Sequence, residues 1–187
     1  MDEDNQDVTS YYDLEFVSKD MIYTPRDLTF KVRDESKIYD GLPLLASDYD
    51  VTNGNFVDEG TVLVLEYTGS QTAVGKSISS IKNDIKPVVK FGDIDVTPLY
   101  NLSNIDGELT VQLREITITS NNATKVYDGT PLFEKNFTYD ESELVPGDKI
   151  VVTNYPSITQ VFESNELNAL DYAIYDKDGV DVTSNYK

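Results

Sequence analysis

Any chemistry in this chain must come from carboxylates, lysines, tyrosines and hydroxyls, because its 187 residues include no His and no Cys. The usual general base and the commonest zinc ligand are therefore missing, and so are thiolate catalysis and disulfides. The 34 Asp and Glu residues guarantee that carboxylate pairs occur somewhere, so such pairs do not indicate glycoside hydrolysis. There is neither a nucleophile elbow nor a phosphate-binding Gly loop. We therefore predict that the chain is not an enzyme and needs no cofactor.

One acidic segment has the composition of a cation-binding loop. Asp176, Asp178 and Asp181 offer oxygen ligands around Gly179, and calcium loops arrange their ligands in a similar way. No Glu follows at the twelfth position, and an Asp-Gly pair is typical of a plain hairpin turn. We therefore predict no metal site and keep these three Asp residues only as a weak calcium candidate.

The charge of the chain excludes two classes of partner. Asp and Glu outnumber Lys and Arg by 34 to 15, which gives a net charge of −19. Charge of this size repels phosphate backbones and anionic lipid surfaces, so we expect neither nucleic acid nor membrane partners. No apolar run approaches the roughly 20 residues of a membrane span.

The most informative feature is an internal repeat with a period of 88 residues. Lys37 to Leu44 recurs as Lys125 to Leu132, with the shared pattern Lys-x-Tyr-Asp-Gly-x-Pro-Leu. A second pattern, Asp-Val-Thr-x-x-Tyr, occurs three times, over residues 7–12, 95–100 and 181–186. The ungapped alignment of residues 7–40 with 95–128 puts Arg26 over Arg114 and Met21 over Leu109. A fixed period indicates tandem copies of one structural unit.

Hydrophobic periodicity predicts that these copies consist of strands. Alternating, β-branched runs cover residues 28–32, 61–67, 115–119 and 149–153. Turn dipeptides separate such runs, at residues 40–41, 53–54, 106–107, 128–129, 146–147 and 178–179. A short turn of helix is conceivable only over residues 79–85.

We therefore predict an all-β chain of two tandem small β-sandwich or β-grasp-like modules arranged as a rod. The expected boundaries are a tail strand of a preceding repeat over residues 1–25, a complete module over 26–112, and a second module over 113–187 that lacks its final strand. A rival division places the modules at 7–93 and 94–187.

The Lys-x-Tyr-Asp-Gly-x-Pro-Leu pattern is interpreted as structural. It fits a strand end, a Gly-dependent turn, and a Pro that fixes φ before Leu enters the core. Each Tyr ring is expected to pack beneath its own turn. The residues assigned to this structural motif are Lys37, Tyr39, Asp40, Gly41 and Pro43 in the first copy and Lys125, Tyr127, Asp128, Gly129 and Pro131 in the second.

Together, these patterns and the Gly-x-Leu-Thr-Val run at residues 107–111 resemble the MBG-type and Ig-like repeat modules of Gram-positive (Firmicutes) cell-surface adhesins. The resemblance covers nearly the whole chain. It implies an extracellular location at the bacterial cell surface or cell wall and an adhesive or spacer role, and it implies no catalytic residues. Proteins of this kind sometimes cross-link a core Lys to an Asn, for which Lys37 or Lys125 would be available. We do not expect this bond, since a Lys at a strand end is usually solvated.

Three hypotheses for function follow. In the first, the chain is a stalk or spacer that holds a distal binding region away from the wall, in contact with neighbouring repeats. In the second, the module itself binds a host surface glycan, mucin or extracellular protein through exposed tyrosines such as Tyr11, Tyr67 and Tyr155. In the third, the second module accepts residues 14–23 of a neighbouring chain as a donor strand, which predicts a strand-exchange oligomer.

Overall fold

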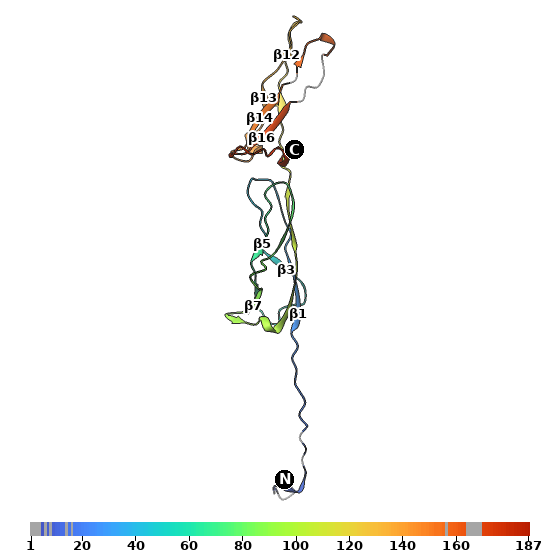
Figure 1. Cartoon of the computed structure of the whole chain (residues 1–187), viewed down its shortest axis with the longest axis vertical. Coiled ribbons are helices and arrows are strands. Elements are labelled where there is room, and N and C mark those ends of the chain that lie inside the picture. The colour runs from blue at the N-terminus through green and yellow to red at the C-terminus, as the bar shows by residue number, and fades with distance from the viewer. Residues whose placement is uncertain are drawn as a thin grey trace.

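The structure is a computed structural model that describes residues 5, 7, 9–13, 15, 17–155, 157–163 and 170–187. It confirms the all-β class: the described residues form several separate sheets and no α-helix, with only five three-residue 3₁₀ turns. Figure 1 shows two sets of strands that follow one another along the long axis, with residues 17–25 extended beyond the first set. We call residues 26–112 the first strand group and residues 114–187 the second strand group.

The first strand group contains ten strands and one 3₁₀ turn. They are β1 (Arg26–Val32), β2 (Glu35–Ile38), β3 (Tyr49–Asn53), β4 (Thr61–Val64), β5 (Tyr67–Thr68), β6 (Gly75–Ile81), β7 (Val88–Phe91), β8 (Ile94–Asp95), η2 (Thr97–Leu99), β9 (Tyr100–Ile105) and β10 (Gly107–Gln112). The strands form three sheets with the orders β3-β1-β9, β2-β10-β6-β5 and β4-β7-β8.

Two of these sheets enclose a core. Leu28 and Phe30 of β1 alternate inward, as the period-two pattern predicts, and meet Leu63 of β4 and Val89 of β7. The ring of Tyr100 closes this core at the start of β9. The predicted strand over residues 28–32 is therefore correct, whereas the run over 61–67 is divided between β4 and β5.

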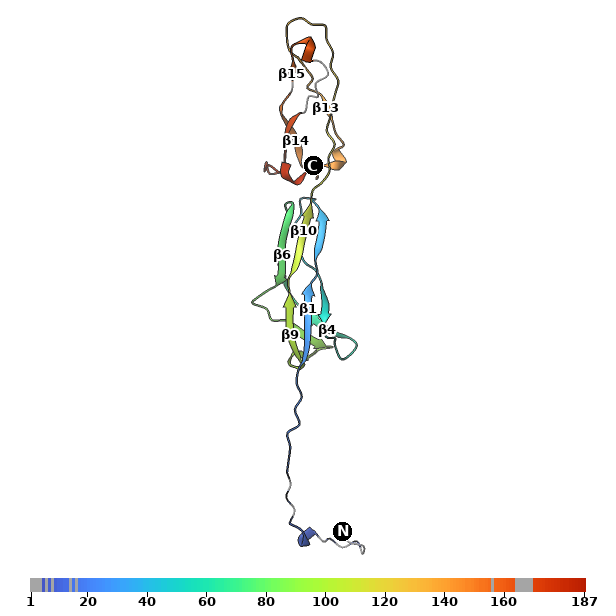
Figure 2. The ribbon, with the colours of Figure 1, turned by 90° about the vertical axis from the view of Figure 1, so that its right-hand side faces the viewer.

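In the first group, two parallel strand pairings follow one another, one in each of two sheets. β9 pairs with β1, β10 then pairs with β2, and both pairings are parallel. Figure 2 shows this run, with β1 beside β9 and β10 beyond them next to β6. Asp106-Gly107 was predicted to be a turn, but the chain keeps its direction there and passes from one sheet to the next. Because β9 and β10 pair with β1 and β2, residues 94–112 belong to the same strand group as residues 26–93.

The second strand group contains six shorter strands and three 3₁₀ turns. They are β11 (Thr119–Ser120), β12 (Leu132–Phe133), β13 (Phe137–Thr138), η3 (Glu141–Glu143), β14 (Lys149–Asn154), β15 (Ser157–Ile158), η4 (Val161–Glu163), β16 (Asp171–Tyr175) and η5 (Thr183–Asn185). They pair two by two, as β11-β13, β12-β15 and β14-β16.

The predicted strand over residues 115–119 is mostly wrong. Its counterpart β1 is held between β3 and β9. In the second group a short parallel bridge joins Arg114 and Ile116 to residues 185–187, and the N–H of Thr117 bonds to the carboxylate of Glu143 instead of to a strand. A strand that lacks a partner along most of its length does not form a ladder. β14 matches the prediction for residues 149–153.

Two smaller points complete the fold. The expected turn of helix over residues 79–85 is instead the end of β6, up to Ile81, followed by a turn. No helix in the described part of the chain is long and apolar enough to cross a membrane. At the N-terminus, η1 (Thr9–Tyr11) is a single 3₁₀ turn.

Candidate functional site at the junction of the strand groups

The two strand groups meet in one apolar cluster. Tyr39 and Val111 of the first group pack with five buried residues of the second, which are Leu144, Val145, Ile174, Val182 and Tyr186. The rings of Tyr39 and Tyr186 meet edge to face, with their centroids 5.6 Å apart and their planes at 78°. This geometry is the favourable one for two aromatic rings. The connection between the groups is therefore a packed core as well as a covalent link.

The hydroxyl of Tyr186 anchors the cluster. It accepts a hydrogen bond from the backbone N–H of Val145 at 3.0 Å and donates one to Oδ2 of Asp148 at 2.5 Å. Burial raises the pKa of Tyr186, and the hydrogen bond to Asp148 raises it further. Burial likewise raises the pKa of Tyr39, with a smaller contribution from the Asp148 charge. Both phenols therefore stay neutral well above neutral pH.

Polar contacts fix the relative orientation of the two groups. The guanidinium of Arg114 donates to three carbonyl oxygens, those of Glu143, Ser142 (2.9 Å) and Tyr39 (3.4 Å), so it joins both groups. Oδ1 of Asn185 accepts a hydrogen bond from the backbone N–H of Val74 at 2.8 Å. A planar guanidinium can bind several acceptors in one fixed geometry, so the junction resists rotation.

The Lys-x-Tyr-Asp-Gly turn of the first copy forms part of this junction. Oδ1 of Asp40 accepts from Nζ of Lys37 at 2.5 Å and from the backbone N–H of Leu42 at 3.0 Å. The contact with Lys37 holds the pKa of Asp40 below its usual value. Gly41 has a φ of 76°, and a Cβ there would lie 3.0 Å from Cγ1 of Val145. The positive φ of the turn therefore favours Gly at position 41, and a Cβ there would also press against Val145 of the second group.

The second copy of the motif forms the same turn. Oδ1 of Asp128 lies 2.7 Å from Nζ of Lys125 and accepts from the backbone N–H of Thr130 at 2.9 Å. Gly129 has a φ of 79°. The contact with Lys125 holds the pKa of Asp128 well below its usual value. Pro43 and Pro131 follow the two turns and are both exposed.

The two tyrosines of the motif have different surroundings. Tyr39 is 4% exposed because it packs across the junction. Tyr127 is 56% exposed and precedes β12, which lies at the far end of the second group in Figure 1. The sequence predicted that each ring packs beneath its own turn. In the structure, Tyr39 is buried against the neighbouring group and Tyr127 is exposed.

The Asp-Val-Thr-x-x-Tyr pattern supplies the other side of the junction. The hydroxyl of Thr183 accepts from the backbone N–H of Ile174 at 2.8 Å, and Oδ1 of Asp181 accepts from the backbone N–H of Thr183 at 2.9 Å. Thr97 makes the matching contact in the first group, accepting from the N–H of Val89 at 2.8 Å. The sequence indicated this pattern only as a marker of the repeat, and its threefold recurrence was the signal from which a structural role could have been inferred.

The weak calcium candidate does not come together as a cation site. Oδ1 of Asp176 accepts from the backbone N–H groups of Asp178 and Val180 at 2.9 and 2.8 Å, and Asp178 pairs with Lys177. Asp181 serves the Thr183 turn. Among the described residues no group of three or more acidic side chains could hold a metal ion.

Neither lysine considered for a cross-link faces an Asn in the contacts that the structure gives it. Nζ of Lys37 contacts Asp40 and the carbonyl oxygen of Leu42. Nζ of Lys125 contacts Asp128 and Thr130.

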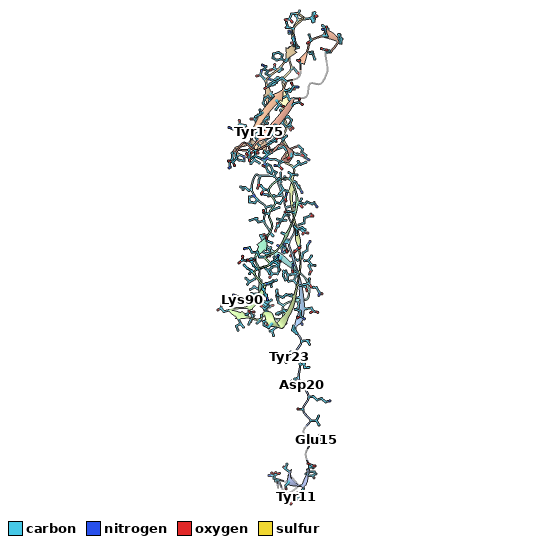
Figure 3. The ribbon with its side chains drawn as sticks, in the orientation of Figure 1. Tyr11, Glu15, Asp20, Tyr23, Lys90 and Tyr175 are labelled. Atoms are coloured by element: carbon cyan, nitrogen blue, oxygen red, sulfur yellow. The ribbon has the colours of Figure 1, made fainter. Side chains whose placement is uncertain are left out.

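The tyrosines proposed for glycan binding are dispersed. Tyr11 is exposed, whereas Tyr67 and Tyr155 are half-buried in different strand groups. Figure 3 shows Tyr11 and Tyr23 along the extended N-terminal segment, far from Tyr175 in the second group. These side chains do not form one aromatic platform of the kind on which a sugar ring could stack.

Comparison with family models, curated proteins and solved structures gave no match to this chain.

Proposed function

We propose that the chain is a spacer segment of a bacterial cell-surface protein, built from tandem copies of one small β-module stacked end to end as a rod. The observation that carries the proposal is the junction, in which both repeated motifs are used. The Tyr-Asp-Gly turn of one copy packs against the Asp-Val-Thr-x-x-Tyr segment of the next. A unit that carries both halves of its own junction can be repeated without limit, which is the requirement for a stalk.

Contacts at equivalent positions support the tandem-module part of this proposal. Arg26 pairs with Tyr100 in parallel, as Arg114 does with Tyr186. The pairing of Thr119 with Thr138 repeats that of Lys31 with Asp50, at the same offset of 88 residues. β1 begins at Arg26 and β10 ends at Gln112, which supports the proposed division into residues 26–112 and 113–187.

The surface location rests on the motif resemblance and on composition. An acidic surface keeps a long, extended protein soluble and resists non-specific adhesion. The spacer reading is preferred to direct glycan binding because the tyrosines that would serve a sugar are dispersed or half-buried.

Small-angle X-ray scattering of the chain tests the rod. A compact domain of this length would have a radius of gyration of about 16 Å, and a stiff rod should give a clearly larger value with a cross-section typical of one module. Arg114→Ala removes the guanidinium that donates hydrogen bonds to both strand groups, and it should increase flexibility at the junction. The matched control is Arg26→Ala, whose guanidinium contacts only Asn55 among the hydrogen bonds of the structure and should leave the scattering curve unchanged. A compact wild-type particle would refute the rod.

A binding screen separates a spacer from a binding module. The chain should show no saturable binding to arrayed host glycans, mucins or extracellular matrix proteins. Saturable binding that is abolished by substitution of exposed tyrosines would establish the binding-module alternative instead.

A further inference from the structure

The chain enters and leaves the first strand group at opposite ends of the long axis of that group. It enters at Arg26, the first residue of β1, and leaves at Gln112, the last residue of β10. Figure 2 shows β1 and β9 side by side in the lower part of the group, and β10 continuing along the same axis to its upper end. A pull on the chain from both sides of the group is therefore directed along these strands.

The strands at the entry and at the exit are hydrogen-bonded to one another, and their pairing is parallel. β1 pairs with β9 over six residue pairs, from Arg26↔Tyr100 to Lys31↔Ile105. β2 then pairs with β10 over four, from Glu35↔Leu109 to Ile38↔Gln112. The bonds of a parallel ladder are evenly spaced along the strands. Opposite pulls at the entry and the exit would slide the strands past each other and load these bonds together, instead of opening them one after another.

Further contacts join the two ladders where β1 passes to β2 and β9 passes to β10. Oδ1 of Asp34 accepts a hydrogen bond from the backbone N–H of Glu108 at 2.9 Å, and Oδ2 of Asp34 contacts Nζ of Lys31 at 2.6 Å. Gly107 lies so close to this segment that a Cβ there would be 2.5 Å from the carbonyl oxygen of Val32. The two ladders are therefore connected, and a force applied to one reaches the other.

The upper ladder leads directly into the junction with the second group. The N–H of Tyr39, the residue after β2, donates to the carbonyl oxygen of Gln112 at 2.9 Å, and the ring of Tyr39 is buried against the second group. Arg114 then pairs in parallel with Tyr186, and its backbone N–H donates to the carbonyl oxygen of Asn185 at 3.0 Å. A load that leaves β10 thus meets a further parallel pairing where the second group begins.

We propose that the paired run of residues 26–38 with residues 100–112 is a mechanical clamp, which lets the first strand group bear tension along the chain. The inference adds a load-bearing role to the spacer function proposed above. The two can fail separately, because a clamp that opens under a small load would leave unchanged the rod shape that scattering measures.

The strength of such a clamp depends on the bonds that the load crosses. Forced unfolding is governed by the rate of unfolding and not by the equilibrium free energy, so the loaded ladders set the force at which the group opens. The sheet β4-β7-β8 contains neither the entry strand nor the exit strand. Its bonds are therefore not on the path of the load.

Single-molecule force spectroscopy of the 187-residue chain in two pulling geometries tests the clamp. The chain has no Cys, so two introduced cysteines are the only thiols to which handles attach. Tyr23→Cys with Leu113→Cys loads the ladders in shear, whereas Tyr23→Cys with Leu99→Cys pulls on neighbouring ends of β1 and β9 and peels them apart. All three positions are exposed. The rupture force in shear should be at least about twofold higher than in peeling, because peeling opens the evenly spaced bonds in sequence.

A matched pair of substitutions tests whether the clamp itself carries the load. Asp34→Ala removes the bond to Glu108 between the ladders. It should lower the rupture force in shear and leave the peeling force unchanged, because peeling begins at the other end of β1. Asp95→Ala removes a bond of the same kind, in which Oδ1 of Asp95 accepts from the backbone N–H of Thr97 at 2.9 Å, and should leave the shear force at its wild-type value. Circular dichroism of each variant would show that it keeps the wild-type fold.

Two results would overturn the proposal. The first is an equal rupture force in the two pulling geometries. The second is a shear force that Asp34→Ala lowers no more than Asp95→Ala does, since the contacts between the ladders would then have no special part in bearing load. A higher force in shear together with selective weakening by Asp34→Ala would establish the clamp.

Discussion

Gly107 is needed for its small size and not for its backbone freedom. It is the point at which the paired run leaves one sheet for the next, and a Cβ there would lie 2.5 Å from the carbonyl oxygen of Val32 and 2.9 Å from that of Arg33. Backbone atoms cannot move aside as a flexible side chain can. Gly107→Ala should therefore lower the free energy of unfolding by about 1 to 3 kcal/mol or more. Urea unfolding followed by tyrosine fluorescence would measure this change.

The control for this substitution is Gly92→Ala. Gly92 has a φ of 59° and nothing within 4 Å of its Cβ position, so only the backbone penalty of about 1 to 2 kcal/mol should appear. Replacement of Gly92 by Asn should recover part of that loss, since Asn tolerates this conformation. Equal costs for Gly107→Ala and Gly92→Ala, with the same recovery by Asn at both sites, would refute the steric explanation.

Ser79 is a polar side chain at a position whose surroundings offer it no hydrogen bond. Its side chain is fully buried in β6, and within the described part of the chain its hydroxyl oxygen has no hydrogen-bond partner. A buried hydroxyl without a partner costs about 1 to 3 kcal/mol in desolvation. Ser79→Ala should therefore leave stability unchanged or raise the thermal midpoint. Ser80→Ala removes a hydrogen bond to Asp106 and should lower the midpoint slightly, so a loss at Ser79 larger than that at Ser80 would contradict the prediction.

Among elements, the junction should respond to alkaline pH through Tyr186. The pKa of this phenol is raised in the folded chain, whereas an unfolded tyrosine ionises near pH 10. Above about pH 10 the unfolded state thus holds fewer protons than the folded state, and stability must fall as pH rises. Tyr186→Phe removes this linkage. It also removes the bonds to Val145 and Asp148, at a cost of about 1 to 3 kcal/mol at neutral pH.

The expected outcome is a difference in thermal midpoint between wild type and Tyr186→Phe that is constant from pH 7 to about pH 10 and narrows as the pH rises further. Thermal unfolding followed by far-ultraviolet circular dichroism at several pH values would measure it. Tyr11→Phe, at an exposed position outside both strand groups, should match the wild type throughout. A difference for Tyr186→Phe that does not narrow at high pH would show that the junction phenol does not govern the alkaline loss of stability.

The elements also show what the sequence can and cannot predict. The alternating pattern correctly predicted β1 and β14. β1 buries every second side chain over its inward-facing part, and β14 pairs with β16 along its length. The same pattern over residues 115–119 failed, since a strand also needs a neighbouring strand, and the pairing at its start is a short bridge of Arg114 and Ile116 with residues 185–187. At Asp106-Gly107 the dipeptide indicated a turn, but the Gly serves a close backbone approach.

The junction could be predicted only in part for a related reason. The repeat identified Tyr39 and the Asp-Val-Thr-x-x-Tyr segment as special positions. Periodicity carries no information about which copy a side chain faces, so the pairing of Tyr39 with Tyr186 and the bridging role of Arg114 became visible only in three dimensions.

For the whole molecule, unbalanced charge should limit stability. The net charge of −19 is distributed over all three parts of the chain, and such self-repulsion disfavours the compact state. Salt also weakens ion pairs, but the nine in the described residues are largely at the surface, where each contributes only about 0 to 1 kcal/mol. Repulsion among the excess acids should outweigh that loss, so the thermal midpoint should rise as NaCl is increased from about 0.01 M to about 0.5 M.

Two substitutions that remove the same charge should then have opposite effects. Asp93 lies in an exposed turn without an ion-pair partner among the described residues, and Asp93→Asn should raise the midpoint slightly at low salt and have no effect at high salt. Asp50 pairs with Arg33 at 2.5 Å, and this contact lowers the pKa of Asp50. Asp50→Asn should therefore lower the midpoint by a small amount, as is usual for the loss of an exposed ion pair. Calorimetry at both salt concentrations distinguishes these effects. If both variants gained stability at low salt by the same amount, net charge alone would decide the outcome and the Arg33 pair would contribute nothing.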